Sequence, residues 1–568
     1  MGPSAPRAVA AGREPPGYGI WIVLAAAALL RIVYLFDYQA HSVFWDSMML
    51  DAEVYDQWAQ RIVAGDWMGG EEVFTLAPLY PYLLAVLFGL FGHVYGAVYA
   101  VQCLLGLASI WLIHDIGRKV FGGWTPLIAA SMAAAYGSLM FLESKLMSTT
   151  LAVLLGLCLM RLLLAAGERQ TLTLWAACGA LLGVAALARP ETLLFAPLAC
   201  WWIYTVTRAR GGSARKPAPI DQYALAGRQP WFAISVFAAF AVIAIAPVTL
   251  RNWVASGDWS LSNLISSQAG ITFYQSNNAR AAGLYVALGR EGFSGDPHAQ
   301  AREEKTIAEK ETGRSLKRSE VTRYWLGRGL RWVAAEPGRF FVLECKKLLR
   351  TLGSCEYSTE YIIYVERETV RSLWLAPLPF ALISGLAIAG LLLQAARGFK
   401  PPAMLLMMFV IANLMALLVF YVSSRYRMPS APYLILFAAS GAEWIWQGLT
   451  SVAAGRRTEA RIYGIVALVC AGIFHVQVDE SHRIQEANVH YNAGNQHYNR
   501  KHYERALAEY KRALAGDPTN WRASYNMGNT LDALGLKQEA IESFREVLKH
   551  NEKMDGARRR IRELGGTP

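Results

Sequence analysis

The stretch GYGIWIVLAAAALLRIVYLF, residues 17–36, decides the fold of this chain. It holds a single charge, Arg31, and about 20 apolar residues are enough for a helix to cross the hydrocarbon core of a bilayer. Arg7 and Arg13 precede it, as in a signal peptide, but the run is long and no small-residue cleavage site follows it. The stretch therefore predicts an uncleaved first transmembrane helix, with Arg31 near its outer end.

Similar apolar runs recur along the 568 residues, of which 54% are hydrophobic and only 17% are charged. A soluble globular protein has about 25% charged residues, so the composition indicates an all-α polytopic membrane protein. A shorter run, 79–91, fits either an interfacial helix or the start of the next span. We expect about eleven transmembrane helices, near residues 18–36, 93–114, 125–142, 146–165, 172–188, 191–207, 231–250, 373–396, 403–421, 431–449 and 461–478.

Positive charge indicates how these spans are oriented, because cytoplasmic loops of membrane proteins carry an excess of Lys and Arg. The formal net charge is +12, and orientation explains this surplus better than nucleic-acid binding, so no nucleic-acid partner is expected. The loops 37–78, 251–372 and 422–430 and the C-terminal tail then lie outside the cytoplasm. The clusters on the cytoplasmic side are Arg7/Arg13, Arg118/Lys119, Arg169, Arg208/Arg210/Arg215/Lys216, Arg397/Lys400 and Arg456/Arg457.

The loop 251–372 is too long for a linker, and its pattern is helical. Residues from about 298 to 351 predict amphipathic helices with a break at 336–338, Glu-Pro-Gly, so we expect a small folded region over the membrane domain. Cys345 and Cys355 fall in this loop, and the sequence does not decide whether a disulfide joins them. No Cys/His spacing is that of a zinc site, and we expect no metal or other cofactor.

The tail contains an internal repeat with a spacing of 34 residues, the period of the tetratricopeptide repeat. Its small residues would let two helices of a hairpin approach closely, and Tyr498 and Tyr510 could fill the interface. The second unit is the weaker match, because the same shift carries Tyr498 onto Asp532. The matching pairs are Tyr491/Tyr525, Gly494/Gly528 and Ala506/Ala540.

Two domains follow from these patterns: a membrane domain over residues 1–480, including the loop 251–372, and a tetratricopeptide repeat domain over residues 484–566. Residues 555–564 predict a capping helix. Two repeats and a cap are few for a repeat array, so we expect the tail to lean on the membrane domain or on a partner.

The first outer loop contains DAEVYDQW, residues 51–58, where carboxylates stand beside aromatic residues. Asp51 precedes Tyr55 by four residues, so the two share a helix face, whereas Glu53 and Asp56 point elsewhere. A carboxylate at the membrane rim suits a general base that acts on a lipid-linked substrate. The alternative interpretation is a helix N-terminus whose solvated acids interact favourably with the helix dipole.

Three more outer turns carry charges that could serve chemistry. Glu143 lies between two apolar spans, where acids are often functional, although a simple ion pair with Lys145 would also explain it. Three arginines could bind a phosphate through charge-assisted hydrogen bonds. They are Arg189, which precedes a proline, and Arg425 and Arg427, which flank a tyrosine. Anchoring at the membrane interface explains these arginines equally well.

The segment 270–285 is rich in amides, aromatic rings and glycine. Amides donate to and accept from sugar hydroxyls, so Tyr274, Asn277 and Asn278 are candidate substrate-binding residues. An ordinary turn is the alternative, because Asn and Gly are common in turns.

Taken together, these residues resemble the GT-C membrane glycosyltransferases, in the branch of the protein O-mannosyltransferases and lipid A aminoarabinose transferases (glycosyltransferase family 39-like). The ordered set covers most of residues 18–450 and is more specific than any one of its motifs. The matching pieces are Asp51 with Tyr55, Ala77-Pro78-Leu79-Tyr80-Pro81, Glu143, Arg189-Pro190, the segment 270–285 and Arg425-Tyr426-Arg427-Met428-Pro429.

The resemblance implies an inverting glycosyltransferase that moves a hexose or pentose from a polyprenyl-phosphate donor to a protein, lipid or glycan acceptor on the extracytoplasmic face. It implies that Asp51 is the catalytic base. The other expected site residues are the supporting acids Glu143 and Asp56, the phosphate-binding Arg189, Arg425 and Arg427, and the substrate-binding Tyr55, Tyr274, Asn277 and Asn278.

One segment departs from the family pattern. Aminoarabinose transferases have Glu-Lys-Pro-Pro-Leu after the first loop, and here residues 75–79 are Thr-Leu-Ala-Pro-Leu, which argues against the same donor and acceptor. The tail looks like that of O-mannosyltransferase relatives with such repeats and suggests a protein acceptor or partner. We expect a bacterial inner-membrane protein in contact with membrane lipid, with its active site and tail in the periplasm.

Two other classes of protein compete with this hypothesis. A multi-span transporter also has polar turns at helix ends, but it predicts charges deep within the spans and internal symmetry, and neither is evident. A membrane-anchored repeat scaffold has no need of so many spans.

Overall fold

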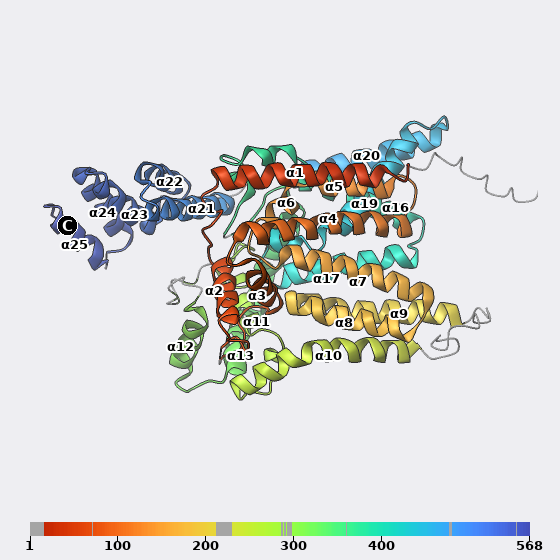
Figure 1. The fold of residues 1–568 in the computed structure, drawn as a ribbon, viewed down its shortest axis with the longest axis horizontal. Helices are drawn as coiled ribbons and strands as arrows, with labels where there is room; N and C mark the ends of the chain where they lie inside the picture. Colours follow the sequence, from red (N-terminus) through yellow and green to blue (C-terminus); the bar gives the residue numbers. More distant parts are fainter. Residues whose placement is uncertain are drawn as a thin grey trace, which may run out of the picture.

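The computed structural model describes residues 16–567 except 71, 212–229, 286–287, 289–290, 292, 294–297, 359, 476–479 and 553. No β-strand occurs in these residues; an isolated β-bridge joins Tyr136 to Pro377. Long helices run side by side in a bundle, and shorter helices gather at one end of it, from which a helical tail projects (Figure 1). We call this end of the bundle, where α1 (Gly19–His41) ends and α4 (Tyr95–Val120) begins, the loop end.

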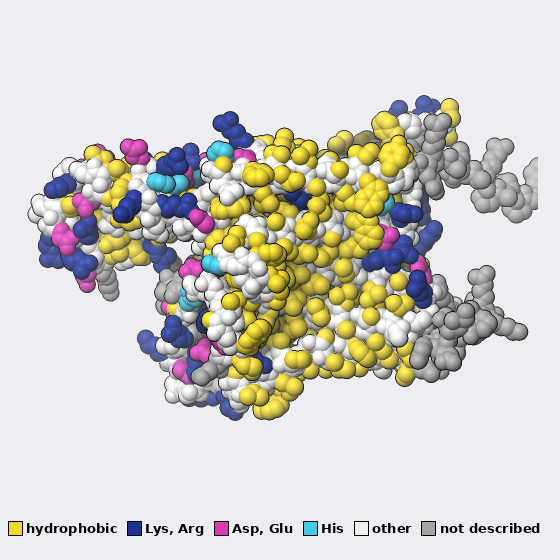
Figure 2. All heavy atoms as spheres, viewed as in Figure 1, with side chains coloured by type: hydrophobic (Ala, Val, Ile, Leu, Met, Phe, Trp, Pro, Cys, Tyr) yellow, Lys and Arg dark blue, Asp and Glu magenta, His cyan; other side chains and the backbone are white. Residues whose placement is uncertain are grey.

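Within the described ranges, six helices are long and apolar enough to cross a membrane: α1, α4, α7 (Thr149–Arg169), α10 (Pro230–Ser256), α17 (Pro401–Val419) and α20 (Ala454–His475). Hydrophobic side chains cover the middle of the molecule and charged side chains gather towards its two ends (Figure 2). The chain is therefore an integral membrane protein, as predicted. The other helices of the bundle are α3 (Leu79–Phe91), α5 (Thr125–Ala135), α6 (Gly137–Glu143), α8 (Leu172–Ala188), α9 (Ala196–Gly211), α16 (Phe380–Ala396) and α19 (Ala431–Leu449).

Helix lies at each of the eleven predicted spans, but three of the spans are interrupted. The predicted span 373–396 begins in a 3-10 helix, η4 (Arg371–Leu375), which ends before α16 starts. The predicted span 125–142 divides into α5 and α6 because Tyr136 is extended (φ −83°, ψ 96°) and bridges to Pro377. The predicted span 191–207 begins as a 3-10 helix, η1 (Pro190–Phe195), before α9. The short run 79–91 forms α3 and packs against α2 (Asp51–Val63) at the loop end.

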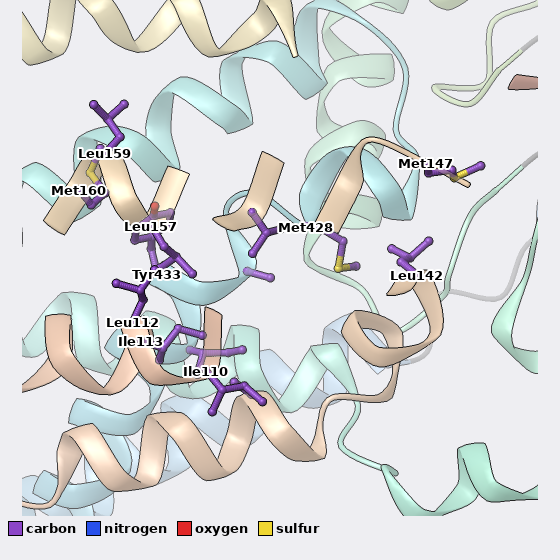
Figure 3. Packing of buried hydrophobic residues seen from close by; sticks show 14 of the residues in the cluster. Ile110, Leu112, Ile113, Leu142, Met147, Leu157, Leu159, Met160, Met428 and Tyr433 are labelled. Atoms are coloured by element: carbon purple, nitrogen blue, oxygen red, sulfur yellow. The ribbon is translucent and has the colours of Figure 1, made fainter. Parts of the chain in front are cut away.

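Small residues let the helices of the bundle approach closely, as is usual in membranes. A Cβ built at Gly179 of α8 would lie 2.0 Å from the carbonyl oxygen of Phe237 on α10. A Cβ at Gly390 of α16 would lie equally close to the carbonyl oxygen of Phe437 on α19, at 2.0 Å. Elsewhere large side chains interdigitate: Figure 3 shows side chains of α4, α7 and α19, including Ile110, Leu157 and Tyr433, packed into one core.

The loop end carries a folded helical region, as predicted. Its two long helices meet at Glu336, which separates the end of α13 from Pro337 at the start of α14, so the predicted break is confirmed. Trp325 and Ile271 belong to a small separate core there, and no disulfide joins the exposed Cys345 to the buried Cys355. The helices of this end are α2, η2 (Leu261–Asn263), α11 (Ala269–Ser276), α12 (Gln300–Thr312), α13 (Arg318–Ala335), α14 (Pro337–Leu352), α15 (Ile363–Glu366), η4 (Arg371–Leu375) and α18 (Ser424–Arg427).

The tail consists of paired helices with a cap. Gly494 packs against the ring of Tyr510, where a Cβ would lie 2.6 Å away, and Gly528 packs against Phe544 at 2.7 Å. Phe544 is thus the large residue of the second unit, and it lies 34 positions after Tyr510. The shift of Tyr498, which leads to Asp532, did not identify it. The helices are α21 (Glu480–Asn499), α22 (Tyr503–Gly516), α23 (Trp521–Ala533), α24 (Lys537–His550) and the predicted cap α25 (Asp555–Glu563).

The tail also contacts the membrane domain, as expected for so short an array. Arg500 donates to the carbonyl oxygen of Val43 at 2.8 Å, and Arg512 pairs with Glu368 at 2.6 Å. The side chain of Gln485 on α21 accepts a hydrogen bond from the backbone N–H of Ser358 at 3.1 Å. The first helix of the tail therefore holds a segment of the loop end, residues 353–362, directly.

Candidate active site

A cavity of about 340 Å³ opens at the loop end, between α2, the end of α8, α11, the end of α17 and α18. Its lining has a polar part, which we call the polar wall, and an apolar part, which we call the apolar wall. The polar wall includes Asp51, Tyr55, Thr149, Arg189, Glu191, Gln268, Thr272, Arg425 and Tyr426. The apolar wall includes Leu193, Leu194, Ala416, Leu417 and Phe420.

Asp51 is the first residue of α2, directly after Leu50, whose φ of 49° turns the chain into the helix. Its Oδ2 lies 2.8 Å from Nη2 of Arg425, and its side chain keeps 26% of its surface exposed. Tyr55, one turn later, lines the same cavity and is buried. Burial, and secondarily the charge of Asp51, raise the pKa of the Tyr55 hydroxyl, so Tyr55 stays a neutral hydrogen-bonding group.

Arg425 stands between two carboxylates. Its Nη2 pairs with Asp51, and its Nη1 lies 2.8 Å from Oε1 of Glu360, which reaches in from the segment 353–362. The guanidinium also donates to the hydroxyl of Tyr426 at 3.2 Å. Arg425 is thus fixed at the cavity wall by partners from three different parts of the chain.

Arg189 is the second guanidinium of the cavity. Its backbone is extended (φ −150°) where α8 ends before Pro190, which directs the side chain across the cavity mouth. It donates to Glu191 at 3.0 Å, to the hydroxyl of Thr149 at 3.1 Å and to the carbonyl oxygen of Arg425 at 3.2 Å. Its Nε is buried and donates to no group within the described ranges.

Three other predicted charged residues lie away from this cavity. Glu143 accepts two hydrogen bonds from Arg31, at 2.7 and 2.6 Å, inside the bundle. Asp56 accepts from His93 at 2.7 Å on the other face of α2. Arg427 points back into the fold, where its Nη2 lies 2.5 Å from Glu356. These contacts give each of the three a structural partner.

The predicted amide cluster also lies outside the cavity. Tyr274 stacks on Trp325, with ring centroids 5.2 Å apart, and Asn278 caps α11 through the carbonyl oxygen of Tyr274 at 2.8 Å. Asn277 donates to the carbonyl oxygen of Val419 and accepts from Lys347 at 3.1 Å. Asn277 therefore holds the helical region against the bundle, whereas Tyr274 and Asn278 make their contacts within that region.

The cavity contains residues that the sequence patterns did not identify. Gln268 and Thr272 face it from the start of α11, one turn apart, just before the amide cluster. Their spacing of four residues places both on one helix face, and this pattern could have identified them from the sequence. Glu360 carried no such signal, because its partner Arg425 is 65 residues away in the sequence. Among the described residues no cluster of three or more His, Cys, Asp or Glu could hold a metal ion.

Two segments of the chain match known protein families. Residues 76–248 match the family of dolichyl-phosphate-mannose-protein mannosyltransferases. This mannosyltransferase-like segment includes Arg189, Glu191 and two residues of the apolar wall, Leu193 and Leu194, and it confirms the resemblance stated from the sequence. Residues 494–535 match the tetratricopeptide repeat, which confirms the repeat in the tail. No curated protein matches the chain significantly.

Several solved structures are similar to the chain at low identity. ArnT from Cupriavidus metallidurans, bound to undecaprenyl phosphate, is 11% identical with a TM-score of 0.42, covering 97% of this chain and 90% of that one. The oligosaccharyltransferase AglB from Archaeoglobus fulgidus, in complex with an inhibitory peptide and a dolichol-phosphate, is 13% identical with a TM-score of 0.39. That match covers 81% of this chain and 56% of AglB, so the chain spans little more than half of AglB's length.

Proposed function

We propose that this protein is an inverting glycosyltransferase that uses a polyprenyl-phosphate-linked sugar as donor. One observation carries the proposal: a carboxylate, Asp51, and two guanidiniums, Arg189 and Arg425, line one cavity together with the apolar wall. A lipid phosphate needs both kinds of wall, cations for its head and an apolar surface for its chain. The mannosyltransferase-like segment supports the same donor class.

The donor phosphate would bind at Arg425 and Arg189, because guanidiniums form strong charge-assisted hydrogen bonds with phosphate oxygens. The Nε of Arg189, which donates to no group within the described ranges, supplies a further donor. The isoprenoid chain would run along the apolar wall towards Leu194, 42% of whose surface is exposed. In this arrangement the sugar faces Asp51.

In the reaction, Asp51 takes the proton of an acceptor hydroxyl as its oxygen forms a bond to the anomeric carbon. The bond from that carbon to the phosphate oxygen breaks on the opposite face, and polyprenyl phosphate leaves with the electron pair. The guanidiniums stabilise its added charge. Because Arg425 pairs with Asp51, a phosphate that binds Arg425 also releases Asp51 to act as base.

We propose that the cavity faces the extracytoplasmic side, the periplasm if the protein is bacterial. Basic residues at the far ends of the spans support this orientation, among them Lys119 at the end of α4 and Arg169 at the end of α7. The repeat tail at the loop end is suited to holding an extended protein segment, so a protein acceptor is our preferred class.

The test is release of polyprenyl phosphate by the purified protein from a panel of polyprenyl-phosphate sugars. The Asp51→Asn variant should lose about 10²–10⁴-fold in turnover, because it removes general-base catalysis. Glu53→Gln, on the same helix but outside the cavity, is the matched control and should keep wild-type turnover.

Equal turnover by wild type and Asp51→Asn would remove Asp51 from the mechanism. Failure of the folded protein to release polyprenyl phosphate from any donor would overturn the glycosyltransferase proposal and favour the transporter hypothesis.

A further inference from the structure

Glu360 is a buried carboxylate beside the cavity that the mechanism above does not use. Only 2% of its surface is exposed. Its Oε1 lies 2.8 Å from Nη1 of Arg425, and its Oε2 is buried and accepts no hydrogen bond within the described part of the chain. A buried carboxylate with one oxygen unpartnered is destabilised in its charged form.

The charge balance around Arg425 is already negative. One guanidinium is shared by two carboxylates, Asp51 and Glu360, each 2.8 Å away. A phosphate that binds Arg425 would bring a third anion to the same cation. Like charges in a poorly solvated site repel strongly, so one of the three anions must be neutralised for the phosphate to bind well.

Glu360 is the anion best placed to be neutralised. Asp51 keeps contact with the cavity, whereas Glu360 lies behind Arg425 and away from solvent. Burial raises the pKa of Glu360 to about 8; the charge of Arg425 opposes this rise and that of Asp51 adds to it. A proton at Glu360 is therefore available near neutral pH.

We propose that Glu360 is a positioning residue that must carry a proton for a lipid phosphate to bind Arg425. Near neutral pH this proton is already in place; above about pH 8 it comes from solvent when the phosphate binds and returns to solvent when polyprenyl phosphate leaves. This inference rests on the proposed function, and it adds a coupling between donor binding and proton uptake. Glu360 never touches the reacting atoms; it acts by holding or releasing Arg425.

Other charged or titratable groups lie near this site, and each has its own partner or contact. Lys145 pairs with Glu366 at 3.4 Å, and Glu356 pairs with Arg427. His482 of the tail contacts the rings of Tyr357 and Tyr364. The groups that face Glu360 from the surrounding elements are Arg425 of α18, Asp51 of α2 and the neighbouring Tyr361.

The experiment measures the Kd of polyprenyl phosphate for the full-length protein between about pH 8 and about pH 9.5. The second pKa of a phosphate monoester is about 6, so the ligand itself does not titrate in this range. Because ionised Glu360 competes for Arg425, the wild-type Kd should rise with pH, approaching about tenfold per pH unit. Calorimetry in two buffers of different ionisation enthalpy should show proton uptake at pH 8.5.

Glu360→Gln is a neutral isostere that keeps an oxygen for Arg425. It should bind polyprenyl phosphate more tightly than wild type above pH 8, with a Kd that no longer changes with pH. The matched control is Glu356→Gln in the same segment. Glu356 also pairs with an arginine of α18, Arg427, and its Oε2 also accepts no hydrogen bond within the described part of the chain. Arg427, however, does not line the cavity. It should keep the wild-type pH dependence.

The outcomes separate the two proposals. Absence of polyprenyl phosphate binding at every pH contradicts the proposed function itself. Binding by wild type without proton uptake and without pH dependence overturns the role of Glu360, and this result needs no variant to fold. A Glu360→Gln protein that binds uniformly more weakly at all pH values would mean that Glu360 is only structural.

Discussion

Arg31 and Glu143 form an ion pair inside the bundle, although 112 positions separate them in the sequence. Each side chain keeps only 3% of its surface exposed, and the guanidinium meets both carboxylate oxygens. Two charges removed from water are stable only together, because each neutralises the other. The ion pair with Arg31 therefore explains why Glu143 is tolerated inside the bundle, and no catalytic role is needed to account for it.

Glu143→Gln should accordingly reduce stability rather than catalysis. Leaving Arg31 as an unpaired buried charge is expected to destabilise the fold by about 3–5 kcal/mol. Thermal unfolding in detergent measures this loss, and residual turnover of the folded fraction should match wild type.

The double variant Arg31→Met/Glu143→Leu is the control, since replacing a whole buried pair with apolar residues is often neutral. Wild-type stability of Glu143→Gln, combined with lost turnover, would instead return Glu143 to the active site.

Four residues of the polar wall were predicted from the sequence. Arg189 and Arg425 stand where an apolar run meets a loop, and Asp51 and Tyr55 lie in the first outer loop, so their position relative to the membrane is readable from hydropathy alone. The same rule also selected Arg427, which lies two residues from Arg425 but points into the fold. Side-chain direction in a single short helix depends on distant partners that spacing does not reveal.

Glycine sets the distances between the helices of the bundle. A side chain at Gly390 of α16 would meet the backbone carbonyl of Phe437 on α19 at 2.0 Å, and a backbone atom cannot move aside as a side-chain end can. Close approach of this kind replaces the hydrophobic driving force that is absent between helices in lipid.

Gly390→Val should therefore destabilise the bundle by roughly 1–3 kcal/mol or more, through overpacking. Unfolding followed by tryptophan fluorescence in detergent measures the change. Gly89→Ala in α3 is the matched control, because nothing lies within 4 Å of the added methyl group. An equal effect of the two substitutions would mean that helix propensity, not packing, decides the result.

Helix positions were predictable because about 20 apolar residues are needed to cross a bilayer, whatever the fold. The break at Tyr136 was not predictable, because it depends on a backbone bridge to Pro377, which is distant in the sequence. In the tail, the period predicted the hairpins, whereas Phe544 was found only when its contact with Gly528 was seen.

Over the whole molecule, the tail meets the membrane domain through two kinds of contact, an exposed ion pair and a hydrogen bond to a backbone N–H. Arg512 and Glu368 are about half exposed, and an exposed ion pair contributes little, about 0–1 kcal/mol. Gln485 instead accepts from the backbone N–H of Ser358, in the segment that also carries Glu360. The second contact is the one that can influence the cavity.

Gln485→Ala should increase amide hydrogen exchange in the segment 354–366 by roughly threefold to tenfold, the effect of losing one hydrogen bond worth about 1 kcal/mol. Hydrogen-exchange mass spectrometry of the full-length protein measures it. Arg512→Ala is the control and should leave the exchange unchanged. Identical exchange in Gln485→Ala and wild type would mean that the tail does not hold this segment.

The same segment is anchored at its beginning as well, where the N–H of Ser354 donates to the carbonyl oxygen of Phe474 at the end of α20. Both anchors come from residues that a ribosome adds late, and domains fold roughly in the order of synthesis. While the chain is being made, α18 can hold this segment through Ser424, which donates to the carbonyl oxygen of Tyr357, and through the pair of Arg427 with Glu356, before either anchor exists. A nascent chain would therefore first hold Glu360 from α18 alone, and would gain the two outer anchors only after α21 had been synthesised and had docked.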